Sequence, residues 1–402
     1  MLGLSAWLSI VAGLATLSVE TTAAPIAVAN ARNDVQRRWK FSRYFDIQGH
    51  RGARGEHSEE LLSAFASGLR AGVSTLELDL GLTKDGHLVV WHDEKLDPTK
   101  CKDTEPAFEG DQQFPYVENE LNLANLTLAQ IKTLDCGSKR LDEFPLALTT
   151  PGGKISTLRE FFDFVDCATD QPVLFNIETK INPDVRNQTR SPPDFVDAFV
   201  TVLRERGPDL IDRVTHQSFD WRALVISKQT IPELRTSALC DDTTLWRYPD
   251  GETTGNLTTH GTGPGNWLAG IDIDDFDGAT PQERAVQAAA SIKADYISPV
   301  GTAYASEVDD PADSGWIPFT TPALTRKAHD LGLKVATWTP DRLNLVSYLV
   351  QNCSVDAVIT DYPTVVHSWA YQQGLKLPDP PYDTSRINQC LERHLQKVPL
   401  SS

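Results

Sequence analysis

Apolar runs with the length of β-strands alternate with amphipathic runs with the length of α-helices along most of this 402-residue chain. This repetition favours a parallel sheet, because each pair of parallel strands needs a long crossover connection, usually a helix. Eight strand regions are expected, at residues 45–49, 75–80 with a following arm at 88–92, 173–178, 214–218, 234–239, 296–299, 334–338 and 357–360. Helices are expected at residues 59–71, 157–165, 194–206, 221–228, 281–292, 322–331, 343–350 and 365–373.

Eight such units favour a (β/α)8 TIM barrel over an open, doubly wound sheet, and no Gly-x-Gly-x-x-Gly or P-loop motif argues for the open sheet. We expect the barrel to span residues 45–375, with an insertion at 94–150 after the second strand region. A second interruption at 241–280 is either a wall of the substrate pocket or a plain surface loop. Residues 32–44 are expected to form a strap or a propeptide, and residues 376–402 a C-terminal extension.

Side chains that bind metals or transfer protons stand at the ends of the expected strands. His50 and Arg51 follow the first strand, Glu77 and Asp79 lie in the second, and His92 ends the arm. Because strand side chains alternate between faces with period two, Glu77 and Asp79 project to the same side. Two neighbouring carboxylates need a neutralising cation or proton, and hard divalent cations take several oxygen ligands. This pattern predicts half of a metal site.

Glu178 is the best candidate for a third carboxylate, because it also ends an apolar run. Lys180, two residues further on, would then face a bound phosphate. His50 and His92 titrate near neutral pH and can act as an acid and base pair, in either order. Arg51 offers a planar fork for phosphate oxygens. Together these groups predict a metal-assisted phosphodiesterase.

Each feature has a plainer interpretation when it stands alone. Glu77 and Asp79 could line a solvated strand face, Glu178 and Lys180 could form a surface ion pair, and Trp338 could belong to the core. Arg54 and Glu56 could be loop charges, and His216 merits attention because it lies near a strand end. The common placement of the polar groups, where strands give way to loops, favours catalysis.

At these residues the chain resembles the glycerophosphodiester phosphodiesterase family, in particular a secreted, eukaryotic, fungal type. The resemblance rests on His-Arg, Glu-x-Asp, His and Glu-x-Lys, and extends through residues 82–86, 127–131, 155–158, 217–220, 335–339 and 358–363. It implies hydrolysis of glycerophosphodiesters, such as glycerophosphocholine, to glycerol 3-phosphate and an alcohol. The implied roles are a cation site for one Mg²⁺ or Ca²⁺ at Glu77, Asp79 and Glu178, acid–base work by His50 and His92, phosphate binding by Arg51 and Lys180, and a pocket wall at Trp338.

Two segments depart from the family pattern. The family usually reads Pro-Glu-Asn-Thr where this chain has residues 58–61, Ser-Glu-Glu-Leu, and it commonly has an Asn where this chain has Pro340-Asp341. Both changes bear on substrate preference more than on the chemical step. Related barrels suggest an alternative, phospholipase D-like cleavage of lysophospholipid or sphingolipid, in which an internal hydroxyl leaves a cyclic phosphate. A further alternative is a secreted binding protein without turnover.

The formal net charge of −18 argues against nucleic acid and anionic membranes as partners, because both repel an acidic surface. A small glycerophosphodiester is the expected partner, and no stable membrane insertion is expected, since after the N-terminal segment no apolar stretch reaches bilayer length. The sequence does not indicate an oligomeric state.

Residues 1–31 have an apolar run and end in Ala-Asn-Ala, which predicts a secretory signal peptide. Six cysteines without a Cys-x-x-Cys spacing suit an oxidising compartment. We expect Cys101 to pair with Cys136 across the insertion, and Cys353 with Cys390 to hold the tail. Four sequons, at Asn125, Asn187, Asn256 and Asn352, agree with a secreted, N-glycosylated protein.

Overall fold

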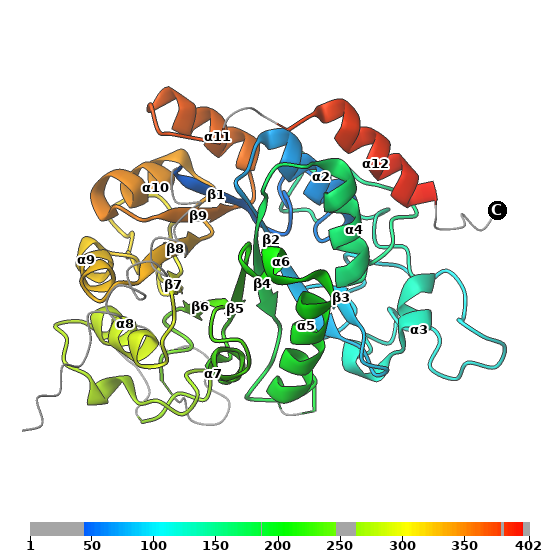
Figure 1. Cartoon of the computed structure of the whole chain (residues 1–402), viewed down its shortest axis with the longest axis horizontal. Coiled ribbons are helices and arrows are strands. Elements are labelled where there is room, and N and C mark those ends of the chain that lie inside the picture. Colours follow the sequence, from blue (N-terminus) through cyan, green and yellow to red (C-terminus); the bar gives the residue numbers. More distant parts are fainter. Residues whose placement is uncertain (1–43, 186, 247–262, 379–381, 397–402) are drawn as a thin grey trace, which may run out of the picture. The chain divides into compact units, whose positions relative to one another are not determined.

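The computed structural model describes residues 44–185, 187–246, 263–378 and 382–396. Eight parallel strands form a closed barrel, since β1 pairs with both β9 and β2 (Figure 1). The barrel strands are β1 (Asp46–Gly49), β2 (Thr75–Leu82), β4 (Leu174–Thr179), β5 (Val214–Ser218), β6 (Arg235–Cys240), β7 (Tyr296–Pro299), β8 (Lys334–Trp338) and β9 (Ala357–Thr360). The expected arm is β3 (Leu88–Val90), which pairs antiparallel with β2. The predicted TIM barrel is confirmed.

Helices surround the barrel and connect its strands (Figure 1). They are α2 (Leu62–Ala71), α3 (Leu128–Thr133), α4 (Leu158–Ala168), α5 (Pro192–Arg206), α6 (Pro208–Ile211), α7 (Trp221–Thr230), α8 (Pro281–Ser291), α9 (Pro322–Asp330), α10 (Leu343–Ser347), α11 (Pro363–Gln372) and α12 (Thr384–Gln396). Short 3-10 turns η1 (Leu123–Asn125) and η2 (Ile273–Asp275) lie in the two interruptions, and the π-helix η3 (Tyr348–Cys353) continues α10. Helix α12 lies in the C-terminal extension expected at residues 376–402, for which no helix was predicted.

Several helices begin at residues whose side chains satisfy the free amide groups of the first turn. Thr157 and Glu160 form a reciprocal capping box at the start of α4, and Thr280 and Glu283 do the same for α8. Helix α2 ends at Gly72, whose φ of 81° is a left-handed conformation that glycine adopts without strain. Local sequence therefore determines these helix ends.

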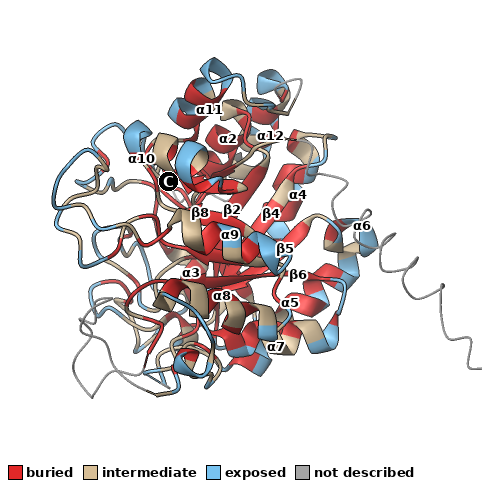
Figure 2. Cartoon of the chain, turned by 90° about the vertical axis from the view of Figure 1, so that its left-hand side faces the viewer, coloured by how far each residue is buried: buried red, intermediate tan, exposed pale blue. Residues whose placement is uncertain are grey.

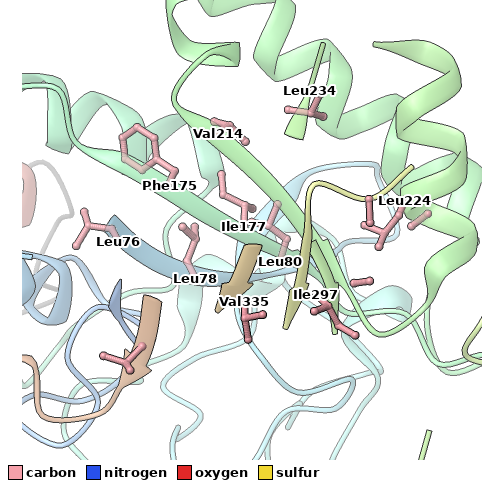
Figure 3. Close-up of a cluster of buried hydrophobic side chains, with 14 of the residues drawn as sticks. Leu76, Leu78, Leu80, Phe175, Ile177, Val214, Leu224, Leu234, Ile297 and Val335 are labelled. Carbon is pink, nitrogen blue, oxygen red and sulfur yellow. The ribbon is translucent and has the colours of Figure 1, made fainter. Parts of the chain in front are cut away.

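The main hydrophobic core lies between the barrel strands and the surrounding helices. Leu76, Leu78 and Leu80 of β2 lie among buried side chains from the neighbouring strands, including Phe175 and Ile177 of β4 (Figure 3). The barrel strands are buried almost throughout, whereas the helices expose their outer faces (Figure 2). Because strand side chains alternate, this packing turns Glu77 and Asp79 away from the leucines, toward the inside of the barrel.

The barrel interior is partly polar below the acidic residues. The side-chain amide of Asn176 donates to Gln48 at 2.8 Å and to Gln217 at 2.9 Å. Gln217 in turn donates to Oε1 of Glu77 at 2.7 Å. This buried hydrogen-bond network links β1, β4 and β5 and holds the carboxylate of Glu77 in one orientation.

The insertion that follows β3 has a hydrophobic core of its own. Leu96, Tyr116 and Ile131 belong to a buried cluster separate from the main core. The predicted disulfide between Cys101 and Cys136 is present and joins the two ends of this segment.

The second predicted disulfide is wrong, because Cys390 pairs with Cys167 and not with Cys353. Cys390 lies on α12, which packs against α4 and α2 (Figure 1), and Cys167 lies in the last turn of α4. Cys353 ends η3, and its buried thiol lies 3.5 Å from the carbonyl oxygen of Thr320. The docking of α12, which the sequence pattern did not reveal, decides the pairing.

Residues 1–31 and all of the predicted strap except Tyr44 lie outside the described residues, as does the sequon at Asn256. The other three sequon asparagines, Asn125, Asn187 and Asn352, are exposed. Among the residues that the structure describes, no helix has the length and apolar character needed to cross a bilayer.

Candidate active site

A cavity of about 490 Å³ opens at the carboxyl ends of the barrel strands. Its wall contains all eight side chains that the sequence singled out: His50, Arg51, Glu77, Asp79, His92, Glu178, Lys180 and Trp338. They come from five strands or the loops that follow them, as is usual for barrels of this type. The fold thus brings the predicted site residues together in one place.

Glu77, Asp79 and Glu178 are buried, and each offers an oxygen within 4.8 Å of the others. Asp79 of β2 and Glu178 of β4 occupy opposing positions in the strand register. Burial, followed by the charge of Asp79, raises the pKa of Glu77 well above its usual value. Burial likewise raises the pKa of Glu178 to about 8, against the opposing effect of Lys180. Burial also opposes ionisation of Asp79, but the charges of His92, Lys180 and Arg51 outweigh burial and lower the pKa of Asp79 below its usual value. Three crowded carboxylates, two of which resist ionisation, fit a site for a hard divalent cation, which would stabilise their charged forms.

Arg51 is held rigidly beside the acidic residues. Its backbone N–H donates to Oε2 of Glu77 at 2.8 Å, with the residue in a left-handed conformation of φ 48°. Its guanidinium contacts Oε1 of Glu59 at 2.9 Å and Oδ2 of Asp79 at 3.2 Å. The atom that faces Asp79 is the buried Nε of Arg51, and this ion pair lacks the geometry of a hydrogen bond, so charge holds the guanidinium beside the acidic residues.

Lys180 completes the positive side of the site. Its ammonium group lies 2.9 Å from Oε1 of Glu178 and 3.1 Å from Nε2 of His92. Burial lowers the pKa of Lys180, but the charges of Glu178 and Asp79 outweigh burial and raise the pKa above its usual value. The side chain therefore remains a cation that can contact a phosphate oxygen.

Each candidate catalytic histidine has a carboxylate at its Nδ1 atom. Nδ1 of His50 lies 2.5 Å from Oδ1 of Asp361, and Nδ1 of His92 lies 2.7 Å from Oδ1 of Asp93. Burial, then the charges of Arg51 and Lys180, lower the pKa of His92 well below its usual value. A carboxylate at Nδ1 fixes the tautomer and orients the ring, so that Nε2 can exchange a proton with a substrate.

Sequence reasoning missed several residues that support the site. Asp93 and Asp361 stood inside recognised motifs, but only the fold shows that they pair with the histidines. Arg54, interpreted as a loop charge, lies in the cavity wall and forms an ion pair with Glu59. Glu60 accepts a hydrogen bond from the backbone N–H of Asp79 at 3.1 Å. Burial and the charges of neighbouring carboxylates raise the pKa of Glu60 well above its usual value.

His216 does not contribute to the cavity wall. It is fully buried, with Nδ1 2.8 Å from Oγ of Ser227 and Nε2 3.0 Å from Oγ1 of Thr179. Burial lowers its pKa to about 3. His216 is therefore a neutral packing residue that joins β5 to α7 and β4.

Aromatic rings form part of the cavity wall. Phe219 contacts Trp338 edge to face, with ring centroids 5.4 Å apart, and contacts Trp267 similarly at 6.2 Å. The carboxylate of Asp241, buried at the end of β6, also lines the cavity, as does Tyr304. Trp267 and Asp241 lie in the second interruption, so the described part of that segment does shape the pocket.

Residues 50–365 match the glycerophosphoryl diester phosphodiesterase family. The chain is 30% identical to a glycerophosphodiester phosphodiesterase of Caldanaerobacter subterraneus subsp. tengcongensis over 48% of this chain and 65% of that relative. It thus spans less than two thirds of the length of the first curated relatives it matches.

Two solved structures are similar. The first, from Silicibacter pomeroyi and assigned as a glycerophosphoryl diester phosphodiesterase, is 26% identical to this chain with a TM-score of 0.62. The match covers 85% of this chain and 99% of that one. A phosphodiesterase of Oleispira antarctica, solved with the product sn-glycerol-3-phosphate, has the same fold at 20% identity and a TM-score of 0.51, over 82% of this chain and 98% of its own.

Proposed function

Because this chain belongs to the glycerophosphoryl diester phosphodiesterase family, we propose that it hydrolyses glycerophosphodiesters to glycerol 3-phosphate and an alcohol, with the help of one divalent cation. The observation that carries this proposal is the meeting of three buried carboxylates and two histidine–carboxylate pairs in one cavity. The product bound to the Oleispira protein is the product expected here.

The residues of the cavity have three roles in the proposed reaction: cation binding, phosphate binding and proton transfer. Glu77, Asp79 and Glu178 would hold the cation, Mg²⁺ or Ca²⁺, which supplies positive charge for a phosphate oxygen when bound. Arg51 and Lys180 bind the remaining phosphate oxygens and stabilise the charge that develops there. One imidazole removes the proton of the nucleophile, and the other protonates the leaving alcohol at its ester oxygen.

We further propose that the alcohol carries a cationic group, as in glycerophosphocholine. Aromatic faces attract quaternary ammonium groups, and the cavity wall contains Phe219, Trp267, Trp338 and Tyr304. The Asp241 carboxyl group lines the cavity and accepts hydrogen bonds from the backbone N–H groups of Thr243 and Thr244 through Oδ1, while burial raises its pKa above the usual value. These groups support recognition of a small cation next to the phosphate site.

The test is to incubate the purified protein with glycerophosphocholine and Mg²⁺ or Ca²⁺, and to follow the products by phosphorus NMR. A glycerol 3-phosphate signal that disappears after chelation of the cation supports the proposal. A cyclic diester signal, with lysophospholipid or sphingolipid as substrate, would support attack by an internal hydroxyl instead. Cation binding without turnover of any diester would indicate a binding protein.

The site of action is a separate proposal. The apolar N-terminal segment, two disulfides and three exposed sequon asparagines support secretion with N-glycosylation. Expression of the full chain in a eukaryotic host tests this proposal. Protein retained inside the cell, with a mass that does not change on treatment with an N-glycosidase, would contradict it.

A further inference from the structure

Lys100, near the start of the insertion, lies between the carboxylate partners of two active-site residues. Its Nζ atom is 2.5 Å from Oδ2 of Asp93 and 2.8 Å from Oε1 of Glu59. Oδ1 of Asp93 lies 2.7 Å from Nδ1 of His92. Oε1 of Glu59 also accepts a hydrogen bond from Nη1 of Arg51 at 2.9 Å. One ammonium group therefore joins the histidine–carboxylate pair to the arginine–carboxylate pair.

The charges of this cluster depend on one another because the cluster is largely buried. The side chains of Glu59 and Lys100 are only 6% and 10% exposed. Burial raises the pKa of Glu59, but the charges of Arg51, Lys100 and Arg54 outweigh burial and lower it well below its usual value. Glu59 is therefore a carboxylate. Removal of the ammonium group would leave the carboxylates of Glu59 and Asp93 without the cation that they share, and a buried charge that loses its partner is strongly unfavourable.

The chain around Lys100 is held in place by local contacts. The backbone N–H groups of Lys100 and Cys101 both donate to the carbonyl oxygen of Asp97, at 3.0 and 2.9 Å. Cys101 also forms the disulfide with Cys136. The Nζ atom of Lys100 lies 5.6 Å from the ring centroid of Trp91, within the range of a cation–π contact. The turn and the disulfide fix the backbone, and the ring restrains the side chain, so the ammonium group is preorganised.

We propose that Lys100 is a positioning residue of the active site, which holds the carboxylate partners of His92 and Arg51 in place at the same time. It acts through Asp93 and Glu59, from behind the cavity wall. Partners of this kind orient the groups that contact the substrate, and an imidazole or guanidinium that loses its orientation loses much of its effect. The insertion thus supplies a supporting part of the catalytic site.

The test compares Lys100→Met and Lys100→Arg with the matched control Lys102→Met. Methionine keeps much of the length of the lysine side chain but removes the charge, whereas arginine keeps a cation. Lys102 belongs to the same segment and pairs with Asp135 at 3.1 Å, but its side chain is 47% exposed. We expect Lys100→Met to lower kcat about 10–100-fold and to raise KM, because His92 and Arg51 both lose support. Lys100→Arg should recover most of kcat, and Lys102→Met should match the wild type.

The kinetic readout rests on the proposed function, whereas proton NMR of the His92 ring does not. The Nδ1–H proton of His92 donates to Asp93, and its resonance can be assigned with a His92→Gln variant. In Lys100→Met this proton should exchange faster with water, because Asp93 is no longer held against the ring. Its exchange rate should be close to that of the wild type in Lys100→Arg and in Lys102→Met.

Circular dichroism checks that each variant is folded. Wild-type kcat or an unchanged exchange rate in Lys100→Met would overturn the inference. A Lys100→Arg variant that loses as much kcat as Lys100→Met would overturn it as well. Absence of turnover in the wild type, with exchange of the His92 proton accelerated in Lys100→Met, would contradict the proposed function alone.

Discussion

Nδ1 of His50 lies 2.5 Å from Oδ1 of Asp361, although the two residues are 311 positions apart in the chain. The contact exists because β1 pairs with β9, the last strand of the barrel, so that the ends of both strands meet at the cavity. His92 obtains its carboxylate from the next residue, Asp93, at 2.7 Å. Each imidazole therefore has a carboxylate at Nδ1. For His92 it comes from the next residue in the chain, and for His50 it comes from a distant residue that closure of the barrel brings close.

Replacement of His50 or His92 by alanine should lower kcat by about 10²–10⁴-fold while the protein stays folded, because a positioned acid or base is lost. His329→Ala is the control, since His329 is a surface histidine with a carboxylate partner outside the cavity. Steady-state kinetics and circular dichroism check the result. Near-normal turnover in both active-site variants would refute the acid–base assignment.

Glu77→Gln should weaken cation binding by roughly tenfold or more, because one of three charged oxygen donors becomes neutral. Both oxygens of Glu77 accept hydrogen bonds, one from the backbone N–H of Arg51 and one from the amide of Gln217, and the single oxygen of glutamine can keep only one of them. Calorimetric titration with Ca²⁺ and Mg²⁺ measures the change without reference to activity. Glu205→Gln, which alters an exposed ion pair with Arg159, should bind the cation as the wild type does.

Asp241→Asn should raise KM for glycerophosphocholine more than KM for glycerophosphoglycerol, whose alcohol is uncharged. The physical reason is that the substitution removes a negative charge from the cavity wall but preserves the shape of the side chain. Trp267→Ala should act in the same direction, since an aromatic contact with a cation contributes about 0.5–2 kcal/mol. Equal changes in KM for both substrates would indicate that these residues do not recognise the headgroup.

Replacing Cys167 and Cys390 together by serine should lower the free energy of unfolding by roughly 2–5 kcal/mol, because the disulfide restricts a long loop of the unfolded chain. The two cysteines are 223 positions apart and join α12 to α4. Urea unfolding of the oxidised proteins measures the difference. If α12 is held by packing alone, the double variant will unfold at the same urea concentration as the wild type.

His216 should make the protein less stable in acid. Its folded pKa of about 3 lies below the usual value of 6.5, so between these values only the unfolded state binds a proton. Stability from this group is complete above pH 6.5 and declines by up to about 1.4 kcal/mol per pH unit as the pH falls toward 3. His216→Gln, compared with the wild type in urea at pH 6.5 and 4.5, should lose less stability over that interval. A parallel loss in both proteins would show that another group is responsible.

The sequence by itself determined the barrel strands, most of the helices between them and the local part of the site. Alternation with period two places Glu77 and Asp79 on one face of a strand and the neighbouring leucines on the other. The structure confirms this, because the leucines lie in the core (Figure 3) and the two carboxylates lie in the cavity. Helix caps such as Thr157 with Glu160 act within one turn of helix and can be predicted directly from the sequence. These features depend on neighbours in the chain, whose spacing is printed in the sequence.

Only the tertiary structure decided the contacts between distant segments. Asp361 reaches His50 because the barrel closes, and Cys390 meets Cys167 because α12 docks on α4, whereas local spacing had favoured Cys353. Strand register and helix docking result from the packing of the whole core, so residues hundreds of positions apart become neighbours for reasons that no local pattern contains.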